Sequence, residues 1–363
     1  MIEGKTIAVV VPAYNEESQI GMVIETMPYF VDRIIIVNDC STDNTSQIVK
    51  EHINKCEKRN IPAIEPIEDN KYNHAEIAAL KRDKEEIKHF IDSSIWNENS
   101  TDRIVLIEQT NNGGVGAAIA RGYKWCKDQS IDCSAVMAGD AQMDPAELES
   151  LCLPVINDNI DYVKGNRLIH RSAWIVIPKI RFFGNSILSI LTKLASGYWH
   201  VSDTQTGYTA ISLNALKSIR IYDIYKSYGM PNDMLVKLNI AFCTLKEIEI
   251  KPVYNVGEQS KMKVAKVIPT VSWLLVKSFF KRLWLKYLFK DFHPLFLLYH
   301  LSFILFGFSI PFFISIVNKI FIPNQVIVSN NLIAFIFLLI TSIQFFLFAM
   351  WMDIQDNERL YKS

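Results

Sequence analysis

The sequence carries no net charge, and it has almost no charge near its carboxyl end. The 38 basic residues balance the 38 acidic ones. This neutrality argues against a dedicated nucleic-acid-binding protein, which normally carries an excess of lysine and arginine. Between Pro294 and Met352 the only Lys, Arg, Asp or Glu is Lys319. The missing charge therefore divides the chain into a polar part and an apolar part.

Signals for metal-binding cysteines and for secretion are also missing. The six cysteines, at positions 40, 56, 126, 133, 152 and 243, include no Cys-x-x-Cys pair, so we expect reduced structural thiols in a cytoplasmic domain. The first apolar run, residues 7–11, is stopped by Pro12 and is too short for the core of a signal peptide. The sequence contains no internal repeat and no low-complexity tract.

Two long apolar runs lie in the charge-poor part. Residues 295–317 and 332–352 contain no Lys, Arg, Asp or Glu. At about 1.5 Å per residue, each is long enough to cross a hydrocarbon layer of about 30 Å. The runs predict a transmembrane hairpin within residues 294–352, and two buried helices of a soluble protein are the alternative.

A basic and aromatic segment, within residues 256–293, precedes the hairpin. Its cations and apolar side chains are interleaved: Lys277, Lys281, Arg282, Lys286 and Lys290 with Trp273, Phe279, Phe280, Trp284, Tyr287 and Leu288. This composition is typical of an amphipathic helix in the headgroup layer on the cytoplasmic side of a cell membrane. We therefore expect residues 1–255 and a tail, 353–363, to be cytoplasmic. A solvated helix that links two domains is the alternative.

Short apolar runs alternate with helical segments in residues 1–255. Strands are predicted at 7–11, 33–37, 104–107, 135–138 and 162–165, and helices after Glu16, Thr42, Val115 and Pro145. This alternation predicts a mostly parallel, doubly wound α/β sheet, in which ligands bind beyond the carboxyl ends of the strands. Residues 56–102 form a charged insertion with a predicted helix over 74–93. The insertion is either a solvated excursion or a lid or oligomer contact.

Acidic and amide side chains follow the first two predicted strands. The two segments are Pro12-Ala13-Tyr14-Asn15-Glu16 and Asn38-Asp39-Cys40-Ser41-Thr42-Asp43. Such groups can grip a nucleobase and its ribose through hydrogen bonds, but the same residues are good turns and helix caps. Each segment alone is therefore weak support for a nucleotide site.

A third polar segment, residues 137–145, follows the fourth predicted strand. Asp140 and Gln142 alternate with small residues, so in an extended segment their side chains point the same way. Their oxygens suit Mg²⁺ or Mn²⁺, which would keep its other positions for diphosphate oxygens and water. Asp144 and Pro145 then begin a helix, as its cap and its first-turn proline.

The combination of these segments, in this order and at strand ends, closely resembles family 2 glycosyltransferases of the GT-A fold. Three more segments carry the resemblance: Asn112-Gly113-Gly114-Val115-Gly116-Ala117-Ala118, Gly139-Asp140-Ala141-Gln142-Met143-Asp144-Pro145 and Gly165-Asn166-Arg167. The hairpin and two further motifs resemble the branch that makes polyprenyl-phosphate sugars, which includes dolichyl-phosphate mannose synthase. These motifs are Asp203-Thr204-Gln205-Thr206-Gly207-Tyr208 and Gly257-Glu258-Gln259-Ser260-Lys261. The resemblance covers nearly the whole chain except the insertion.

The resemblance implies roles for individual residues. Nucleotide-sugar binding would fall to residues at the strand ends: Pro12, Tyr14, Asn15, Glu16, Asn38, Asp39, Gly113, Gly139 and Asp140. Asp140 and Gln142 would hold Mg²⁺ or Mn²⁺ against the donor diphosphate. Arg167 and Arg181 would meet the acceptor phosphate, with surface ion pairing as the alternative. Lys261 would help to close the site, and Asp203 would act directly or support the acceptor loop.

Two positions depart from the family pattern. Asn38-Asp39 stands where the family commonly has two aspartates, and Ala138 stands where the usual Asp-x-Asp has its first acid. Asp140 is then the only carboxylate of that pair, so a metal ion would rely on Gln142, water and the donor itself.

The resemblance implies an inverting hexosyltransferase that acts on a UDP- or GDP-sugar and a membrane polyprenyl phosphate, for glycan or cell-envelope assembly. A phosphate monoester is largely dianionic at neutral pH, so it needs no base, and arginines would hold it in line for attack. The implied partners are the nucleotide sugar, the lipid acceptor and the membrane, but no nucleic acid. The two helices also offer surface for self-association.

Three other functions are open. A processive polysaccharide synthase would carry a Gln-x-x-Arg-Trp motif, which Phe280-Lys281-Arg282-Leu283-Trp284 does not match. Transfer to a hydroxyl of a lipid-linked saccharide would need a base, for which Asp203 and Asp144 are the candidates. Ala138 favours a non-catalytic membrane adaptor that retains a glycosyltransferase shell.

Overall fold

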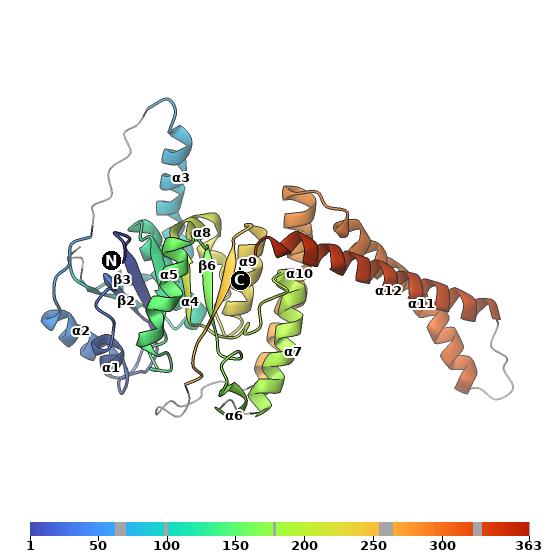
Figure 1. The fold of residues 1–363 in the computed structure, drawn as a ribbon, viewed down its shortest axis with the longest axis horizontal. Coiled ribbons are helices and arrows are strands. Elements are labelled where there is room, and N and C mark those ends of the chain that lie inside the picture. Colours follow the sequence, from blue (N-terminus) through green and yellow to red (C-terminus); the bar gives the residue numbers. More distant parts are fainter. Residues whose placement is uncertain (62–69, 98–100, 177–178, 254–263, 322–328, 363) are drawn as a thin grey trace.

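An α/β domain and a long helical hairpin are the two main parts of the molecule (Figure 1). The computed structural model describes residues 1–363 except 62–69, 98–100, 177–178, 254–263, 322–328 and 363. At 174, 179–185, 264–267 and 321 it describes the backbone alone.

One eight-stranded sheet forms the centre of the domain, with the strand order β3-β4-β2-β1-β5-β7-β6-β8. β1 pairs in parallel with β2 and β5, β2 with β4, and β6 with β8. β7 runs antiparallel between β5 and β6, and β3 runs antiparallel at the edge, beside β4. The strands are β1 (Ile7–Ala13), β2 (Arg33–Asn38), β3 (Ser93–Ile95), β4 (Ile104–Gln109), β5 (Cys133–Val136), β6 (Tyr162–Asn166), β7 (Thr209–Ser212) and β8 (Leu245–Glu249).

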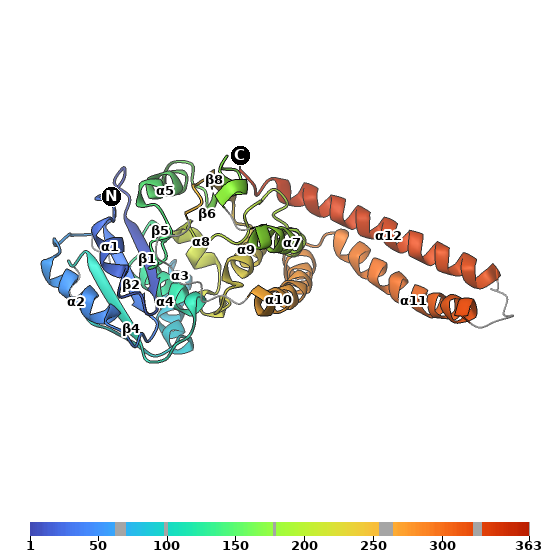
Figure 2. The ribbon, with the colours of Figure 1, turned by 90° about the horizontal axis from the view of Figure 1, so that it is seen from below.

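Helices cover both faces of the sheet, which explains why the central strands β2 and β5 are buried at every residue. Every residue of β2 is buried, as is typical of a parallel strand between two helical layers. One face packs on α1 (Ile20–Glu25), α2 (Thr45–Lys55) and α5 (Leu148–Asn157). The other face packs on α4 (Val115–Asp128), α8 (Leu213–Ser218) and α9 (Met230–Ile240). Figure 2 shows α5 and α4 on opposite sides of the strands.

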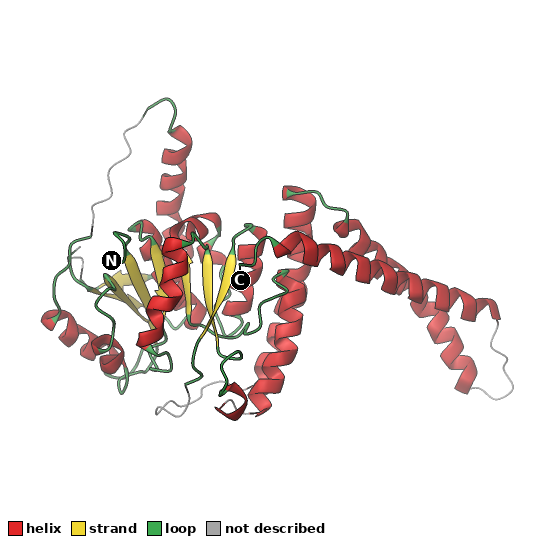
Figure 3. Cartoon of the chain, in the orientation of Figure 1, coloured by secondary structure: helices red, strands yellow, loops and turns green. Residues whose placement is uncertain are grey.

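The predicted mostly parallel α/β architecture is confirmed, and each of the five predicted strands is present. Sequence reasoning missed the short strands β3, β7 and β8. Figure 3 shows the strands of the sheet packed between helices. The helix predicted over 74–93 is too long. α3 (His74–Glu85) continues only as a 3-10 turn, Glu86–His89. Ser93–Ile95 then form β3, so part of the charged insertion belongs to the sheet.

A third apolar core joins the domain to the hairpin. α7 (Lys179–Ser196) and α10 (Val264–Trp284) lie side by side between the sheet and the hairpin (Figure 1). They pack with α9 and the base of the hairpin around Leu275, Phe279 and Tyr299. The other short elements are α6 (Ala173–Val176), the 3-10 turns Pro145–Glu147 and Ile221–Asp223, and a π-helical segment, Leu285–Lys290.

The hairpin consists of α11 (Leu295–Phe321) and α12 (Ser329–Glu358), which are both longer than the predicted runs. Leu295–Ile320 and Ser329–Glu358 are long and apolar enough to be candidate membrane spans. The two helices contact each other through Ser302 and Ser342, whose hydroxyls each donate to the other's backbone carbonyl at 2.9 and 3.0 Å.

Two cations of the basic segment are buried, which corrects the expectation that they face lipid headgroups. Arg282 and Lys286 are both 0% exposed. Arg282 donates to the two carboxylate oxygens of Asp353 at 2.7 Å each, and Lys286 Nζ donates to Asn357 Oδ1 at 2.6 Å. Because these partners lie at the end of α12, the two cations fasten the hairpin to the domain. Among the aromatic residues of the segment, Trp273, Phe280 and Trp284 are exposed, whereas Phe279 and Tyr287 are buried.

The last residues return to the sheet. α12 runs to Glu358, well into the segment expected to be a tail. Leu245 N donates to Leu360 O at 2.7 Å, and Lys362 N donates to Leu245 O at 2.8 Å. The end of the chain therefore lies along β8, where Figure 1 marks it.

Candidate functional site

The carboxyl ends of β1, β2 and β5 meet at one edge of the sheet. Asp39 N, after β2, donates to Ala13 O of β1 at 2.9 Å, and Gly139 N, after β5, donates to Pro12 O at 3.3 Å. Three polar segments that are far apart in the sequence are thereby brought together, as the doubly wound fold predicts.

The chain turns sharply after each of these three strands. Asn15, Cys40 and Ala141 have positive φ angles of 54°, 59° and 57°. A non-glycine residue in this region costs roughly 1–3 kcal/mol, and such residues tend to cluster at functional sites. Because three such residues lie at the same edge of the sheet, this edge is the candidate position of a ligand site.

Hydrogen bonds to backbone groups brace the residues expected to bind the nucleotide. Asn15 Oδ1 accepts from Thr42 N at 2.8 Å, and Asn38 Oδ1 accepts from Ser41 N at 3.0 Å. The Asn15 amide connects the loops after β1 and β2, and the Asn38 amide braces the turn after β2 itself. Tyr14 is 37% exposed on the same loop, and Glu16 ends it with its carbonyl accepting from Gln19 N at 3.0 Å.

The buried carboxylate of Asp39 joins β2 to the start of α4. Its two oxygens accept from Gly113 N at 2.7 Å and Gly114 N at 2.8 Å. Gly114 has a φ of +85°, and a Cβ there would meet Lys226 O at 2.5 Å, so only glycine fits. Asp39 therefore shapes the glycine loop, and base recognition by Asp39 stays a prediction.

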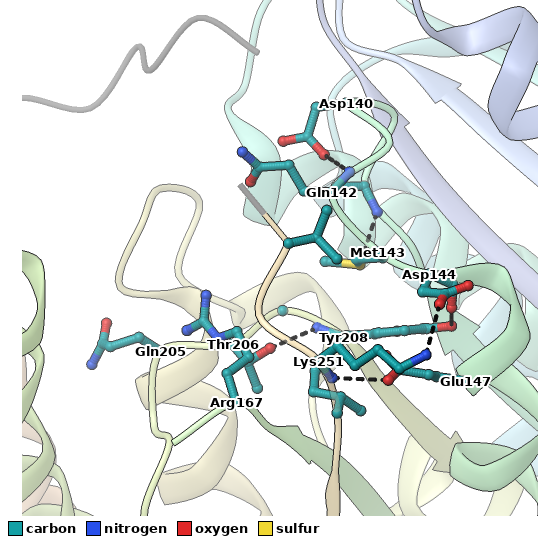
Figure 4. Close-up of a pocket in the computed structure, with 14 residues that line it drawn as sticks. Asp140, Gln142, Met143, Asp144, Glu147, Arg167, Gln205, Thr206, Tyr208 and Lys251 are labelled. Atoms are coloured by element: carbon teal, nitrogen blue, oxygen red, sulfur yellow. Dashed lines mark hydrogen bonds and ion pairs between the residues drawn. The ribbon is translucent and has the colours of Figure 1, made fainter. Parts of the chain in front are cut away.

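A pocket of about 200 Å³ opens beside this edge, between the segments that follow β5, β6 and β8 (Figure 4). Three predicted site residues line it: Asp140, Gln142 and Arg167. In Figure 4, Asp140 and Gln142 lie on one side, and Arg167 lies on another side near Gln205. The remaining lining residues are Ala138, Met143, Asp144, Glu147, Gln205, Thr206, Gly207, Tyr208, Ile250, Lys251 and Val253.

The segment with Asp140 and Gln142 is a turn, so the expectation of an extended segment is wrong. β5 ends at Val136, Ala141 is left-handed, and Gln142 N donates back to Asp140 Oδ1 at 3.1 Å. Both side chains nevertheless line one pocket. Asp144 caps the following helical turn as predicted, because its Oδ1 accepts from Ala146 N at 2.9 Å.

These two oxygen donors fit a divalent cation only in part. Within the described residues, no cluster of three or more His, Cys, Asp or Glu side chains could hold an ion by itself. Mg²⁺ and Mn²⁺ commonly take one or two protein oxygens and complete their shell with water and substrate phosphates. Asp140 and Gln142 therefore suit an ion that arrives with a diphosphate.

Arg167 and Asp203 form a two-pronged ion pair at the pocket. Arg167 Nε donates to Asp203 Oδ2 at 2.8 Å, and Nη2 donates to Oδ1 at 3.0 Å. The Asp203 side chain is 1% exposed, and the Arg167 side chain is 23% exposed. Burial alone would raise the pKa of Asp203, but the Arg167 guanidinium outweighs it and holds that pKa below its usual range. Asp203 also accepts from Gln205 N and Thr206 N, at 3.3 and 3.2 Å.

Two predicted residues cannot be assigned to the pocket. Arg181 lies in α7, where the structure describes its backbone alone, and Lys261 lies outside the described residues. Sequence reasoning did not assign Lys251 or Glu147 to the site. Lys251 N donates to Glu147 Oε1 at 2.8 Å, and Lys251 Nζ lies 3.6 Å from Asp144 Oδ2. Lys251 lies in none of the motifs named above. Its position shortly after β8 is the feature that could have pointed to it.

Comparison with known proteins identifies the family. Residues 8–75 and 81–220 match the family described as "Glycosyl transferase family 2". One relative, UDP-N-acetylglucosamine–dolichyl-phosphate N-acetylglucosaminyltransferase of Methanococcus voltae, is 30% identical over 69% of this chain and 87% of its own length. Dolichyl-phosphate beta-glucosyltransferase ALG5D of Trichomonas vaginalis is 24% identical over 76% of this chain and 74% of its own.

Solved structures show a more distant likeness. Glucosyl-3-phosphoglycerate synthase of Mycobacterium tuberculosis, crystallised with Mn²⁺, UDP-glucose and phosphoglyceric acid, superposes with a TM-score of 0.46 and 18% identity. The superposition covers 77% of this chain and 80% of the other. The match to the family and to its named enzymes shows that the chain belongs to glycosyl transferase family 2 and is a glycosyltransferase.

Proposed function

We propose that the protein transfers a hexose from a nucleotide sugar to a membrane polyprenyl phosphate, with inversion at the anomeric carbon. The observation that carries the proposal is one pocket that holds both a cation for a phosphate, Arg167, and oxygens for a metal-bound diphosphate, Asp140 and Gln142. The names of both relatives specify dolichyl phosphate. The two apolar helices would anchor the enzyme where such an acceptor resides.

Arg167 would meet the acceptor phosphate. Asp203 holds Nε and Nη2 of Arg167, which fixes the plane of the guanidinium before any ligand arrives. A preset guanidinium loses little further side-chain freedom when it binds a phosphate, and it holds the attacking oxygen in line.

The pocket suits a phosphate acceptor better than a hydroxyl acceptor. A hydroxyl needs a base to remove its proton, whereas a phosphate monoester, with a second pKa near 6, is already largely dianionic at neutral pH. Asp203 is a poor base because it is buried and bound to Arg167. Asp144 is engaged as a helix cap and lies near the Lys251 ammonium.

The donor diphosphate would lie beside Asp140 and Gln142. These two residues would hold Mg²⁺ or Mn²⁺, an ion that acts as a Lewis acid on a departing diphosphate. The nucleoside would extend toward the edge formed by Pro12, Tyr14 and Asp39. We infer a cytoplasmic domain, because Lys277, Lys281 and Lys290 lie close to the hairpin in the sequence and positive charge marks the cytoplasmic side.

A donor screen tests the proposal. The purified full chain in detergent is incubated with short polyprenyl phosphate and UDP-N-acetylglucosamine, UDP-glucose or GDP-mannose, with Mg²⁺, Mn²⁺ or a chelator. We expect a product that mild acid cleaves, as a sugar phosphodiester is cleaved. Arg167→Lys should lower kcat/KM for the acceptor about 100-fold, because it loses the in-line fork.

Arg171→Lys is the matched control. Arg171 is exposed and does not line the pocket, so its variant should match the parent protein. An acid-stable product, formed only when a lipid-linked saccharide replaces the polyprenyl phosphate, would instead assign a hydroxyl acceptor. No turnover with any donor would leave a non-catalytic adaptor as the explanation and end the proposal.

A further inference from the structure

A lysine lies fully inside the protein directly behind the Arg167–Asp203 pair. Lys164 is on β6, and its side chain is 0% exposed. In the sheet it stands next to Thr209 of β7 and Glu247 of β8. A charged side chain in the interior is rare unless it is paired, so its neighbours should explain why it is there.

Lys164 and its neighbour Glu247 both contact the turn that supports Arg167. Its ammonium donates to Thr206 O, in the turn that Asp203 begins. Thr206 also lines the pocket. On the other side of this turn, the Glu247 carboxylate accepts from Ser202 N at 3.0 Å and from Asp203 N at 3.2 Å. Lys164 and Glu247 thus hold the turn at both ends.

The charged groups that face Lys164 are Asp203, Glu247 and Arg167. With Lys164 protonated, two cations and two carboxylates balance within this small region. Without that proton, the two carboxylates share only Arg167, and the Thr206 carbonyl loses its charged donor. The charge balance of this buried cluster therefore depends on the protonated amine of Lys164.

We propose that Lys164 is a positioning residue: its ammonium fixes the turn 203–206 and, through Asp203, holds Arg167 at the pocket for the acceptor phosphate. This inference rests on the proposed function, since it assumes that Arg167 meets the acceptor. Lys164 itself makes no contact with substrate in this scheme.

Burial gives the scheme a pH dependence. Desolvation lowers the pKa of Lys164 from its usual 10.5 to about 8, although Asp203 and Glu247 favour the charged form. The ammonium, and with it the positioning of Arg167, should be lost as the pH rises through about 8. The contribution of Lys164 to stability has the opposite sign. The unfolded chain binds more protons than the folded one between about 8 and 10.5, so this contribution rises with pH.

Acceptor kinetics across pH 6.5–9.5 test the proposal, with short polyprenyl phosphate and the donor found in the screen. In the parent protein, kcat/KM for the acceptor should fall above about pH 8, while KM for the donor stays within about twofold. Lys164→Met keeps an unbranched apolar stem and removes the charge. It should lower acceptor kcat/KM about 10- to 100-fold and abolish the alkaline decline.

Two further variants keep the test sharp. Lys164→Met with Glu247→Gln removes one charge of each sign and should recover part of the lost kcat/KM if charge balance matters. Lys246→Met, on the same strand as Glu247, is the matched control. Lys246 lies 3.9 Å from Asp158 and outside the pocket, so its variant should show the parent profile.

The outcomes separate this inference from the proposed function. If the parent protein transfers no sugar to polyprenyl phosphate, the proposed function fails and this inference fails with it. If the parent protein is active but shows no decline above pH 8, the inference alone is overturned, even if Lys164→Met does not fold. The same holds if Lys164→Met keeps the decline, or if it weakens donor and acceptor equally.

Discussion

Two arginine–aspartate pairs in this molecule have nearly the same geometry and opposite surroundings. Arg167 binds Asp203 through two hydrogen bonds of 2.8 and 3.0 Å, and Arg282 binds Asp353 through two of 2.7 Å. Arg167 is 23% exposed at a pocket, whereas Arg282 is 0% exposed.

The remaining contacts of Arg282 explain its role. Arg282 also donates to Ala195 O at 2.9 Å, to Leu194 O at 3.1 Å and to the Tyr287 hydroxyl at 3.2 Å. It is thus surrounded by protein acceptors and joins α7, α10 and α12. A two-pronged arginine–aspartate ion pair can therefore serve either binding or stability. Exposure beside a pocket distinguishes an arginine that can meet a ligand from one that fastens helices together.

The largest effect should come from breaking the enclosed pair. Asp353→Ala leaves Arg282 buried without its carboxylate, and we expect the free energy of unfolding to fall by about 3–5 kcal/mol. Chemical denaturation of the full chain in detergent measures it. The double variant Arg282→Met, Asp353→Leu should regain most of the loss, because a well-packed apolar pair can replace a buried ion pair. A single variant as stable as the parent would contradict the fastening role.

Breaking the pair at the pocket should affect activity more than stability. Asp203→Asn keeps the shape of the side chain and removes the charge that holds Arg167. We expect kcat/KM for the acceptor to fall about 10- to 100-fold, with a smaller loss of unfolding free energy than for Asp353→Ala. Steady-state kinetics and denaturation on the same sample compare the two. If Asp203→Asn chiefly unfolds the protein, the two pairs serve the same purpose and the comparison fails.

The smallest effect should come from crowding the enclosed pair. Gly197 has a φ of +78°, and a Cβ there would meet Arg282 Nη1 at 2.5 Å. Gly4 has a φ of +77° with no atom within 4 Å of its Cβ position. Both Gly→Ala variants carry backbone strain of about 1–2 kcal/mol, but only Gly197→Ala should also displace Arg282. The difference between their unfolding midpoints measures that displacement. Equal midpoints would show that Arg282 shifts at no cost.

Sequence reasoning succeeded where local pattern and strand order act together. Continuous apolar runs gave β1, β2 and β4, and the residues after them, such as Asp39 and Asp140, lie at one edge because parallel strands end together. It failed for β8, whose segment Leu245–Glu249 is charged at three of its five positions and does not alternate regularly, and for β7, which has only four residues. Such strands are defined by their neighbours in the sheet.

Sequence reasoning also failed to predict which charged side chains are buried. Their partners are far away in the sequence, so no local pattern indicates the pairing. The sequence suggested that Arg282 binds lipid headgroups, since its partner Asp353 lies 71 positions away, near the end of the second hairpin helix. Lys164 lies in β6, and no residue near it in the sequence indicates that it contacts the turn 203–206. The burial of Arg282 and Lys164 depends on the three-dimensional path of the chain, which the sequence does not show directly.

The hydrogen bonds of the last residues along β8 have a practical consequence for anyone who produces this protein. An affinity tag or fluorescent fusion after Ser363 would start next to Lys362, whose backbone is bonded to Leu245. The opposite end offers no easier choice, because the Met1 ammonium is bound to the Asp32 carboxylate at 2.8 Å. A fused partner at either end should therefore be joined through a generous flexible spacer, and the untagged enzyme should be assayed beside it.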